Sequence, residues 1–438
     1  MSTKKRIINI LFWSVISAAF IGPGTVTTAA GSGAAYGSSL LWALLFSTLA
    51  CLLLQEAAAR ISIVTGKNLG QSISDYFENS PSKTPVLILV LGAILIGAAA
   101  YEMGNLIGAV EGIKLIINIP SYLLVLAIGF SAVVLLSIPS LRVVSTTLGV
   151  LVVVMGIGFL VTAIMVRPAF AEIIKGTFIP SFPGPEAGTL VLALIGTTIV
   201  PYNLFLGSGL SKAGQSLKEM RSGLTVAILL GGIFSMAVLI SGSAISGIFS
   251  FESLAAVLTE RMGPAGKYLL GFGLFAAGFT SAVTAPLAAA VTLSSLFGQK
   301  RPVKWGSSSW RYRITWIIVL CTGLAFASMN IKPVPAIILA QALNGFLLPF
   351  VSIFLYIVIQ RSLYERSLSN SISNLLMLIV IYVTLIIGLN SAIKAVARLM
   401  VPEFINTLST QIIIAAFSLV VIILVAVRGR KGLNNLNS

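Results

Sequence analysis

Apolar runs of about 20 residues recur along the whole of this 438-residue chain, and they restrict its fold more than any other feature. A run of about that length crosses the hydrocarbon core of a bilayer as a helix. We count twelve, at 9–36, 39–62, 86–112, 121–140, 146–166, 188–211, 223–248, 268–297, 314–330, 334–360, 373–391 and 410–427. The sequence therefore predicts an all-α polytopic membrane protein with 11–12 transmembrane helices.

The composition excludes a soluble protein of this size. Only 9% of the residues are charged and 57% are hydrophobic, whereas soluble domains carry about 25% charged residues. The longest polar stretches, at 64–85, 167–187, 298–313 and 361–372, have the length of loops between spans. We therefore expect residues 1–438 to form a single transmembrane domain.

The positive charge of the chain predicts its orientation. The formal net charge is +16, from 28 Lys and Arg against 12 Asp and Glu. Basic residues concentrate in cytoplasmic loops, and twelve spans with a cytoplasmic N-terminus place 20 basic residues inside and 8 outside. We expect a multi-pass protein of the cytoplasmic (inner) membrane with both termini in the cytoplasm. Its partner is the lipid bilayer and not nucleic acid.

The sequence contains no recognisable catalytic or cofactor-binding motif. It has no histidine, no nucleophile–base pair and no phosphate-binding loop. Cys51 and Cys321 both fall in apolar runs, where cysteine acts as a small space-filling residue. We therefore expect neither an enzyme nor a bound cofactor.

Proline interrupts two of the apolar runs near their middle. Pro23 lies in the first run and Pro201 in the sixth, and proline removes a backbone hydrogen bond and clashes with the preceding turn. Matched breaks in the two halves of a chain are typical of inverted repeats with discontinuous helices. We expect repeats at 9–166 and 188–360 and extra helices at 373–427. Two ordinary proline kinks are the alternative.

The breaks carry two four-residue motifs, Gly22-Pro23-Gly24-Thr25 and Val200-Pro201-Tyr202-Asn203. They resemble Asp-Pro-Gly-Asn and Met-Pro-His-Asn of the Nramp family of proton-coupled divalent-metal transporters. Further similar segments are Gln55 to Arg60, Thr65 to Leu69, Asn203 to Ser208, and Gln341 followed by Leu348-Pro349-Phe350. The resemblance implies a LeuT-type fold of two inverted five-helix repeats, a substrate site where spans one and six unwind, and a monomer.

The resemblance also implies which residues line the site, and three of them depart from the family. The family binds its metal through the Asp and Asn of the first motif and the Met of the second, which are here Gly22, Thr25 and Val200. The remaining implied site residues are Gln341, which the family shares, and Ala19 and Thr197, which would offer backbone carbonyls. A divalent ion without an anionic ligand is strongly unfavourable at membrane depth, so we predict no metal-binding residue.

The replaced ligands favour an organic solute. A broken helix exposes free amides and the positive end of its dipole, and LeuT-type transporters hold substrate carboxylates at such ends. Glycine at position 22 removes a negative charge that would repel a carboxylate. The expected pocket consists of Gly22, Gly24 and Thr25, with Tyr202, Asn203 and Gln341 as polar anchors. The alternative for Tyr202 is packing between helices.

Glu102 is the strongest candidate for a proton carrier. The family carries Asp-x-x-Glu in the third run, and this chain reads Ala99-Ala100-Tyr101-Glu102 and keeps only the glutamate. An acidic residue inside a membrane is functional by default. The resemblance adds Arg311 to the pathway, since Arg311-Tyr312-Arg313 is similar to the family's arginine pair. The alternative is a structural Glu102 that pairs with an arginine or a backbone amide.

Three functions are compatible with this sequence. We expect first a secondary active transporter of a small organic solute, a carboxylate or an amino-acid-like compound, with proton symport through Glu102. The second is a proton-coupled transporter of a divalent metal ion of the Mn²⁺ or Mg²⁺ type with an altered, weaker site. The third is a sensor or partner subunit that does not transport, which the intact repeat architecture disfavours.

Overall fold

The computed structural model describes residues 22–137, 142–211, 216–298, 302–329, 331–364, 371–400 and 408–434. All regular structure in these ranges is helical. The elements are α2 (Pro23–Tyr36), the 3-10 helix η1 (Gly37–Leu40), α3 (Leu41–Thr65), α4 (Leu69–Tyr76), α5 (Lys83–Lys114), α6 (Ser121–Ser137), α7 (Arg142–Val166), α8 (Phe170–Phe178), α9 (Ala187–Thr198), α10 (Pro201–Leu210), α11 (Leu217–Gly242), α12 (Phe251–Met262), α13 (Ala265–Phe297), α14 (Pro302–Trp305), α15 (Trp310–Ala327), α16 (Pro333–Tyr364), α17 (Ser371–Met400) and α18 (Leu408–Asn434).

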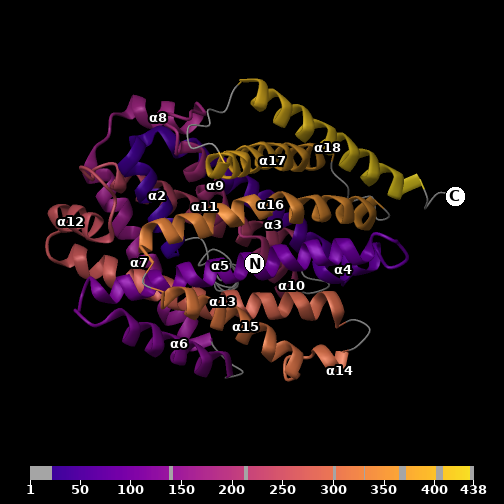
Figure 1. Cartoon of the computed structure of the whole chain (residues 1–438), viewed down its shortest axis with the longest axis horizontal. Coiled ribbons are helices and arrows are strands. Elements are labelled where there is room, and N and C mark those ends of the chain that lie inside the picture. The colour runs from indigo at the N-terminus through magenta and orange to yellow at the C-terminus, as the bar shows by residue number, and fades with distance from the viewer. Residues whose placement is uncertain are drawn as a thin grey trace.

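The longer helices lie along the long axis of the molecule and form one bundle (Figure 1). α8 and α12 lie at one end of this bundle, and α4 and α14 lie at the other. Eight helical stretches in the described ranges are long and apolar enough to cross a membrane, and α6 and Val152–Val166 are shorter apolar helices. The chain is thus a multi-pass membrane protein. The boundaries of the two repeats stay a prediction.

Each expected span contains helix where the structure describes it, but α11 ends at Gly242 and α15 at Ala327, before the expected ends at 248 and 330. The first is seen only from Pro23 onward, because residues 9–21 lie outside the described ranges. η1 joins α2 and α3 without a polar loop, so that Pro23–Thr65 is one apolar stretch. A non-helical turn at Ile199 and Val200 splits the sixth span into α9 and α10.

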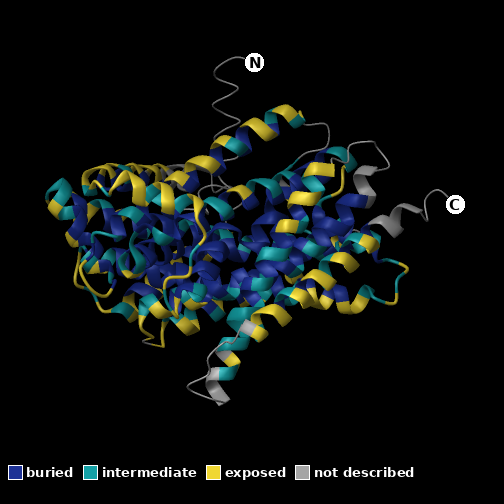
Figure 2. Cartoon of the chain, turned by 90° about the horizontal axis from the view of Figure 1, so that it is seen from above, coloured by how far each residue is buried: buried dark blue, intermediate teal, exposed yellow. Residues whose placement is uncertain are grey.

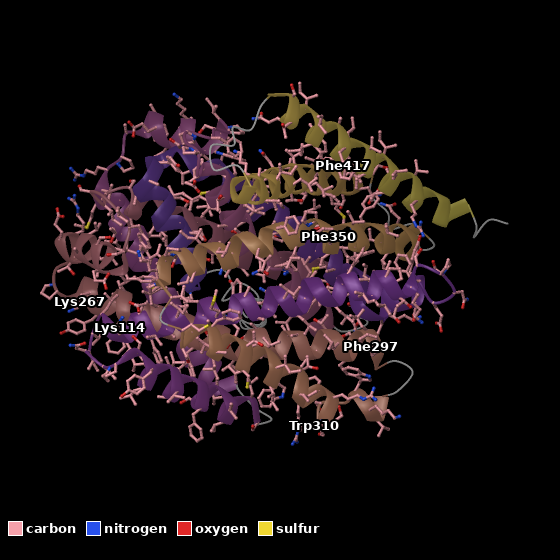
Figure 3. The ribbon with its side chains drawn as sticks, viewed as in Figure 1. Lys114, Lys267, Phe297, Trp310, Phe350 and Phe417 are labelled. Atoms are coloured by element: carbon pink, nitrogen blue, oxygen red, sulfur yellow. The ribbon has the colours of Figure 1, made fainter. Side chains whose placement is uncertain are left out.

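α5 and α13 pack against each other along the bundle. Helices of 32 and 33 residues are about 50 Å long, more than a bilayer core requires. Glycine permits the close contact, because a methyl group on Gly278 would lie only 2.6 Å from the carbonyl oxygen of Asn105. Lys114 ends α5 and Lys267 lies near the start of α13, and both sit at the same end of the bundle (Figure 3). The two helices are therefore antiparallel.

Buried residues fill the centre of the bundle, and exposed residues lie along its outside (Figure 2). Many exposed side chains are large and apolar, among them Phe130 and Leu339, as expected where lipid surrounds the protein. The centre nevertheless contains polar side chains, and those of Thr25, Glu102 and Gln341 are completely inaccessible. Polar groups at membrane depth are costly and usually functional, so the centre of the bundle is the candidate site.

Candidate functional site

The break in the sixth span falls at the second sequence motif. α9 ends at Thr198 and α10 begins at Pro201, with Val200 extended between them at φ −84° and ψ 122°. Proline is favoured at the first position of a helix, because that position needs no amide donor. The helix break predicted at Pro201 is therefore confirmed.

α2 begins in the same way. Gly22 precedes it in an extended conformation, at φ −100° and ψ 175°, and its carbonyl accepts the amide of Val26 at 3.1 Å. Pro23 takes the first helical position. The candidate Ala19 lies outside the described residues. The described part of the first span thus starts at the first motif, at the predicted position of the break.

The helix that starts at Pro23 meets the end of α9 through two threonine hydroxyls. Oγ1 of Thr25 lies 3.0 Å from Oγ1 of Thr197, although the two residues are 172 positions apart in the sequence. Both side chains are inaccessible to solvent. The structure therefore brings these two predicted site residues together, and Thr197 contributes its hydroxyl to the contact.

Gln341 of α16 closes the same region from a third side. A methyl group on Gly24 would overlap the side-chain amide of Gln341, and one on Gly196 would overlap its backbone carbonyl. Within the described ranges neither amide atom of Gln341 has a hydrogen-bond partner, and nor has Oδ1 of Asn203. Buried polar atoms are normally bonded, and no described residue bonds these atoms, so they are candidate partners for water or a solute.

Two tyrosines pack beside the start of α10. The ring centroids of Tyr101 and Tyr202 are 5.7 Å apart with an interplanar angle of 85°, a favourable edge-to-face arrangement. The hydroxyl of Tyr101 is hydrogen-bonded to Thr197. Tyr202 therefore packs between helices, which is the alternative considered for it. Its ring contacts that of Tyr101, which is hydrogen-bonded to the site residue Thr197. Tyr101 was not predicted from the sequence, and its only signal was its position next to Glu102.

Glu102 is buried on α5 and faces α15, where a methyl group on Gly323 would overlap its side chain. The amide of Asn105, one turn along the helix, faces the carboxyl group. Neither carboxyl oxygen has a well-formed hydrogen bond among the residues that the structure describes. A buried carboxyl group without a firm partner fits a group that gains and loses a proton better than it fits a structural ion pair.

Arg311 lies apart from Glu102. The residue is exposed, and its guanidinium carbon is 5.7 Å from the centre of the Trp305 ring at the α14 end of the bundle. Twelve residues of α15 separate it from Gly323, about 18 Å along the helix axis. Arg311 thus stacks on an aromatic ring at the end of α15, and its place in a proton pathway stays a prediction.

The side-chain atoms at the helix starts that could coordinate a cation are uncharged oxygens. No three His, Cys, Asp or Glu side chains in the described ranges are grouped so that they could hold a metal ion. The polar side chains at the two helix starts are the hydroxyls and amides of Thr25, Thr197, Asn203 and Gln341. Such groups can bind a hard cation that keeps part of its water shell, and they can also bind a polar organic solute.

Sequence comparisons identify relatives with a named activity. Residues 14–394 match the family described as natural resistance-associated macrophage protein-like, or Nramp. The divalent metal cation transporter MntH of Bacillus subtilis (strain 168) is 26% identical over 375 residues, which cover 82% of this chain and 85% of that protein. MntH of Acidiphilium cryptum (strain JF-5) is 28% identical over 353 residues, which cover 76% and 78%.

Solved structures share the fold. The manganese transporter of Eremococcus coleocola, in complex with an aromatic bis-isothiourea substituted compound, matches with a TM-score of 0.74 at 19% identity and covers 98% of this chain and 96% of its own. Mhp1, a nucleobase-cation-symport-1 family transporter, matches with a TM-score of 0.57 at 15% identity, covering 97% and 93%. The fold is of the LeuT type, as predicted. Since the family match spans most of the chain and the helix starts fall at the family's two motifs, this chain belongs to the Nramp family.

Proposed function

We propose that this chain is a proton-coupled secondary transporter of the cytoplasmic membrane that moves a divalent metal ion of the Mn²⁺ or Mg²⁺ type. The observation that carries the proposal is that the side-chain amide of Gln341 and Oδ1 of Asn203, buried near the two helix starts, have no hydrogen-bond partner among the described residues. Its support is the match to a family whose relatives are named as divalent metal cation transporters. Cytoplasmic termini, from the distribution of basic residues, and a monomer complete the proposal.

The ion enters this site with part of its hydration. Mg²⁺ dehydrates reluctantly and usually keeps several waters when bound to protein. The hydroxyls of Thr25 and Thr197 and the amide of Gln341 then bind either the ion or its waters. Carboxylate and thioether side chains are absent at Gly22 and Val200, so binding is weaker than in a site that has both.

Glu102 supplies the negative charge that a divalent ion requires at this depth. Glu102 and Glu111 are the buried carboxyl groups in the described ranges, and Glu111 is already paired with Lys114 at 2.9 Å. Glu102 follows Tyr101 directly and interacts electrostatically with Tyr202. Release of its proton toward the cytoplasm, when the cation binds from the outside, moves the two ions in the same direction.

A small organic solute is the second candidate. In its favour, position 22 carries no carboxylate, and a helix start offers free amides that attract a substrate carboxylate. The names of the relatives give this candidate no support, since they refer to metal cations. The comparisons therefore reverse the order expected from the sequence alone and favour the metal ion.

Uptake into proteoliposomes tests the proposal. The purified protein is reconstituted, and entry of Mn²⁺ and Mg²⁺ is followed with an enclosed dye, with and without an inward proton gradient. A panel of labelled carboxylic and amino acids is measured in parallel. We expect saturable metal uptake that the gradient accelerates, and loss of that acceleration in Glu102→Gln. Saturable uptake of an acid without any metal flux contradicts the proposal and selects the second candidate.

A further inference from the structure

An apolar groove of about 560 Å³ lies between α6 and α13, which pack against each other and against α5. One wall is a single face of α6, because Leu124, Ile128, Ser131 and Leu135 recur at the spacing of one helical face and all line the groove. The hydroxyl of Ser131 donates to the carbonyl of Ala127 at 2.8 Å, within its own helix. This wall therefore suits a hydrocarbon partner.

The opposite wall is aromatic and belongs to α13. Phe275 and Phe279 line the groove, and their rings stack with centroids 5.7 Å apart and an interplanar angle of 8°. Tyr268 and Phe272 precede them at a spacing that places all four side chains on one face of the helix, and both are exposed. The aromatic surface therefore continues from the groove toward the start of α13.

The length of the groove selects its occupant. Leu135 lies eleven residues after Leu124 on α6, which is about 16 Å along the helix axis. Half of a hydrocarbon core of about 30 Å is about 15 Å, whereas an apolar helix of another protein would need the full thickness. The groove therefore has the length of one acyl chain in one leaflet of the bilayer.

Two lysines lie at the end of the bundle where the groove begins. Lys114 follows the lining residue Ile113, and Lys267 lies eight residues before Phe275, about 12 Å along α13; Figure 3 shows both lysines at the same end. Lys267 is exposed and forms no ion pair with a residue that the structure describes. Tyr122, near the start of α6, is exposed as well, and tyrosine is enriched at the level of the lipid headgroups. This end of the groove therefore suits a phosphate group.

We propose that this groove is a binding site for one phospholipid of the bilayer, with an acyl chain between α6 and α13 and the phosphate at Lys267. A lipid with a net negative charge binds more tightly than a zwitterionic one, because a basic residue near the membrane surface contributes about a fivefold gain in affinity. The bound lipid joins α6 to α13 and raises the melting temperature of the protein. The site is independent of the solute that the protein transports.

Native mass spectrometry of the full-length protein in detergent tests the proposal. Copurified lipid is removed, and the protein is titrated with phosphatidylglycerol or with phosphatidylcholine of the same acyl chains. Ala127→Trp places an indole ring in the groove and should weaken binding of phosphatidylglycerol at least about tenfold, since each buried methylene contributes about fourfold. Val134→Trp fills the groove from its other end and should have the same effect.

Two further variants complete the experiment. Leu126→Trp is the matched control, because Leu126 is adjacent to Ala127 on α6, is 64% exposed and does not line the groove. It should bind phosphatidylglycerol as the wild type does. Lys267→Ala leaves the groove unfilled and should remove the preference of about fivefold for phosphatidylglycerol over phosphatidylcholine.

Saturable binding of one phosphatidylglycerol that both groove variants lose and the control keeps supports the site. Equal affinities in Ala127→Trp, Val134→Trp and Leu126→Trp overturn it, and so does a wild-type protein that retains no lipid. An unchanged lipid preference in Lys267→Ala overturns the assignment of the phosphate to Lys267. Palmitate that binds in place of phospholipid, or a dimer that Ala127→Trp disrupts, overturns the proposal by identifying a different occupant.

Discussion

The two helix starts at the centre of the protein share a backbone conformation and differ in their side chains. Pro23 and Pro201 each occupy the first position of a helix, and the residue before each proline is extended. The first start has glycine before its proline, whereas the second has Val200. The chain therefore keeps the helix starts of its family at positions where the family's ligand side chains are gone.

The neighbours of the two helix starts indicate where an added side chain can be accommodated. A methyl group at position 22 would lie at ordinary contact distance, 3.7 Å or more, from its described neighbours, whereas one at position 24 would overlap Gln341. At the second start the side chains of Val200 and Tyr202 are both 2% exposed and fill their surroundings. A small side chain at position 22 should therefore disturb the packing less than one at position 24.

The largest effect is expected for Gly24→Ala. The added methyl group would overlap the amide of Gln341 and lie 3.1 Å from Oγ1 of Thr197. The glutamine side chain can turn away, so the protein still folds but one site group is displaced. An overpacking cost of about 2 kcal/mol corresponds to a loss of about 30-fold in transport efficiency. Metal uptake by proteoliposomes measures it.

Gly22→Ala is the matched control, because it adds the same methyl group at the same helix start where neighbours lie at 3.7 Å or more. We expect less than about a twofold change, within the range of substitutions that touch no special feature. Equal losses in the two variants would show that the two positions do not differ in the way their contacts indicate.

For Gly22→Asp we expect metal transport to improve about tenfold, in contrast to the loss expected for Gly24→Ala. The added carboxylate restores an anionic ligand for a hard cation. Aspartate is also favoured at a helix N-cap, the place that Gly22 occupies, so stability should not fall. We expect the KM for Mn²⁺ to drop about tenfold, the effect of 1.4 kcal/mol.

Gly22→Asn separates charge from size in that experiment. Asparagine has the shape of aspartate and caps helices equally well, but it carries no charge. Its KM should stay near the wild-type value. If Gly22→Asp abolishes uptake of metal and Gly22→Asn does not, the site binds an anion and the organic solute becomes the better candidate.

The helix starts were predictable from the sequence because their cause is local. Proline at positions 23 and 201 dictates where a helix can begin, whatever packs against it. The twelve apolar runs were predictable for a similar reason, since the length of a span depends on the thickness of the bilayer. Both features follow from a few consecutive residues and needed no knowledge of the packing.

The neighbours of the helix starts could not be predicted, because they depend on how distant helices pack. The contact between Thr25 and Thr197 joins residues 172 positions apart. Tyr101 carries no motif, and only its contacts with Thr197 and Tyr202 bring it to notice. The position of Arg311 on the ring of Trp305 could not be predicted for the same reason, since similarity to a motif does not say at which depth of α15 the side chain lies.

A smaller effect is expected for Thr25→Val, which removes the hydroxyl group and keeps the shape of the side chain. The bond of 3.0 Å to Thr197 is lost, and a buried hydrogen bond contributes about 0.5–1.5 kcal/mol. We expect a fall of about 3–10-fold in transport efficiency and a slightly lower melting temperature. Thr25→Ser, which keeps the hydroxyl, is the control, and equal activity of the two variants would exclude a role for the hydroxyl.

The smallest effect is expected for Val200→Met, which restores the family's thioether at the crowded helix start. Val200 is 2% exposed, so the longer side chain has to displace neighbours at a cost of about 1 kcal/mol. That cost offsets most of the binding free energy that a soft ligand would add. We expect total Mn²⁺ uptake to change by less than about threefold, with the preference for Mn²⁺ over Mg²⁺ rising because sulfur suits softer ions.

Val200→Leu is the control for that variant, since it adds similar volume without sulfur. The ratio of Mn²⁺ to Mg²⁺ uptake should rise only in Val200→Met, whereas any loss from crowding should appear in both. A gain as large as that of Gly22→Asp would contradict the contrast between the two starts, because it would show that position 200, which already carries a side chain, accepts a ligand as readily as the glycine at position 22. A changed ratio in Val200→Leu would instead assign the selectivity to packing at α10 and not to the thioether.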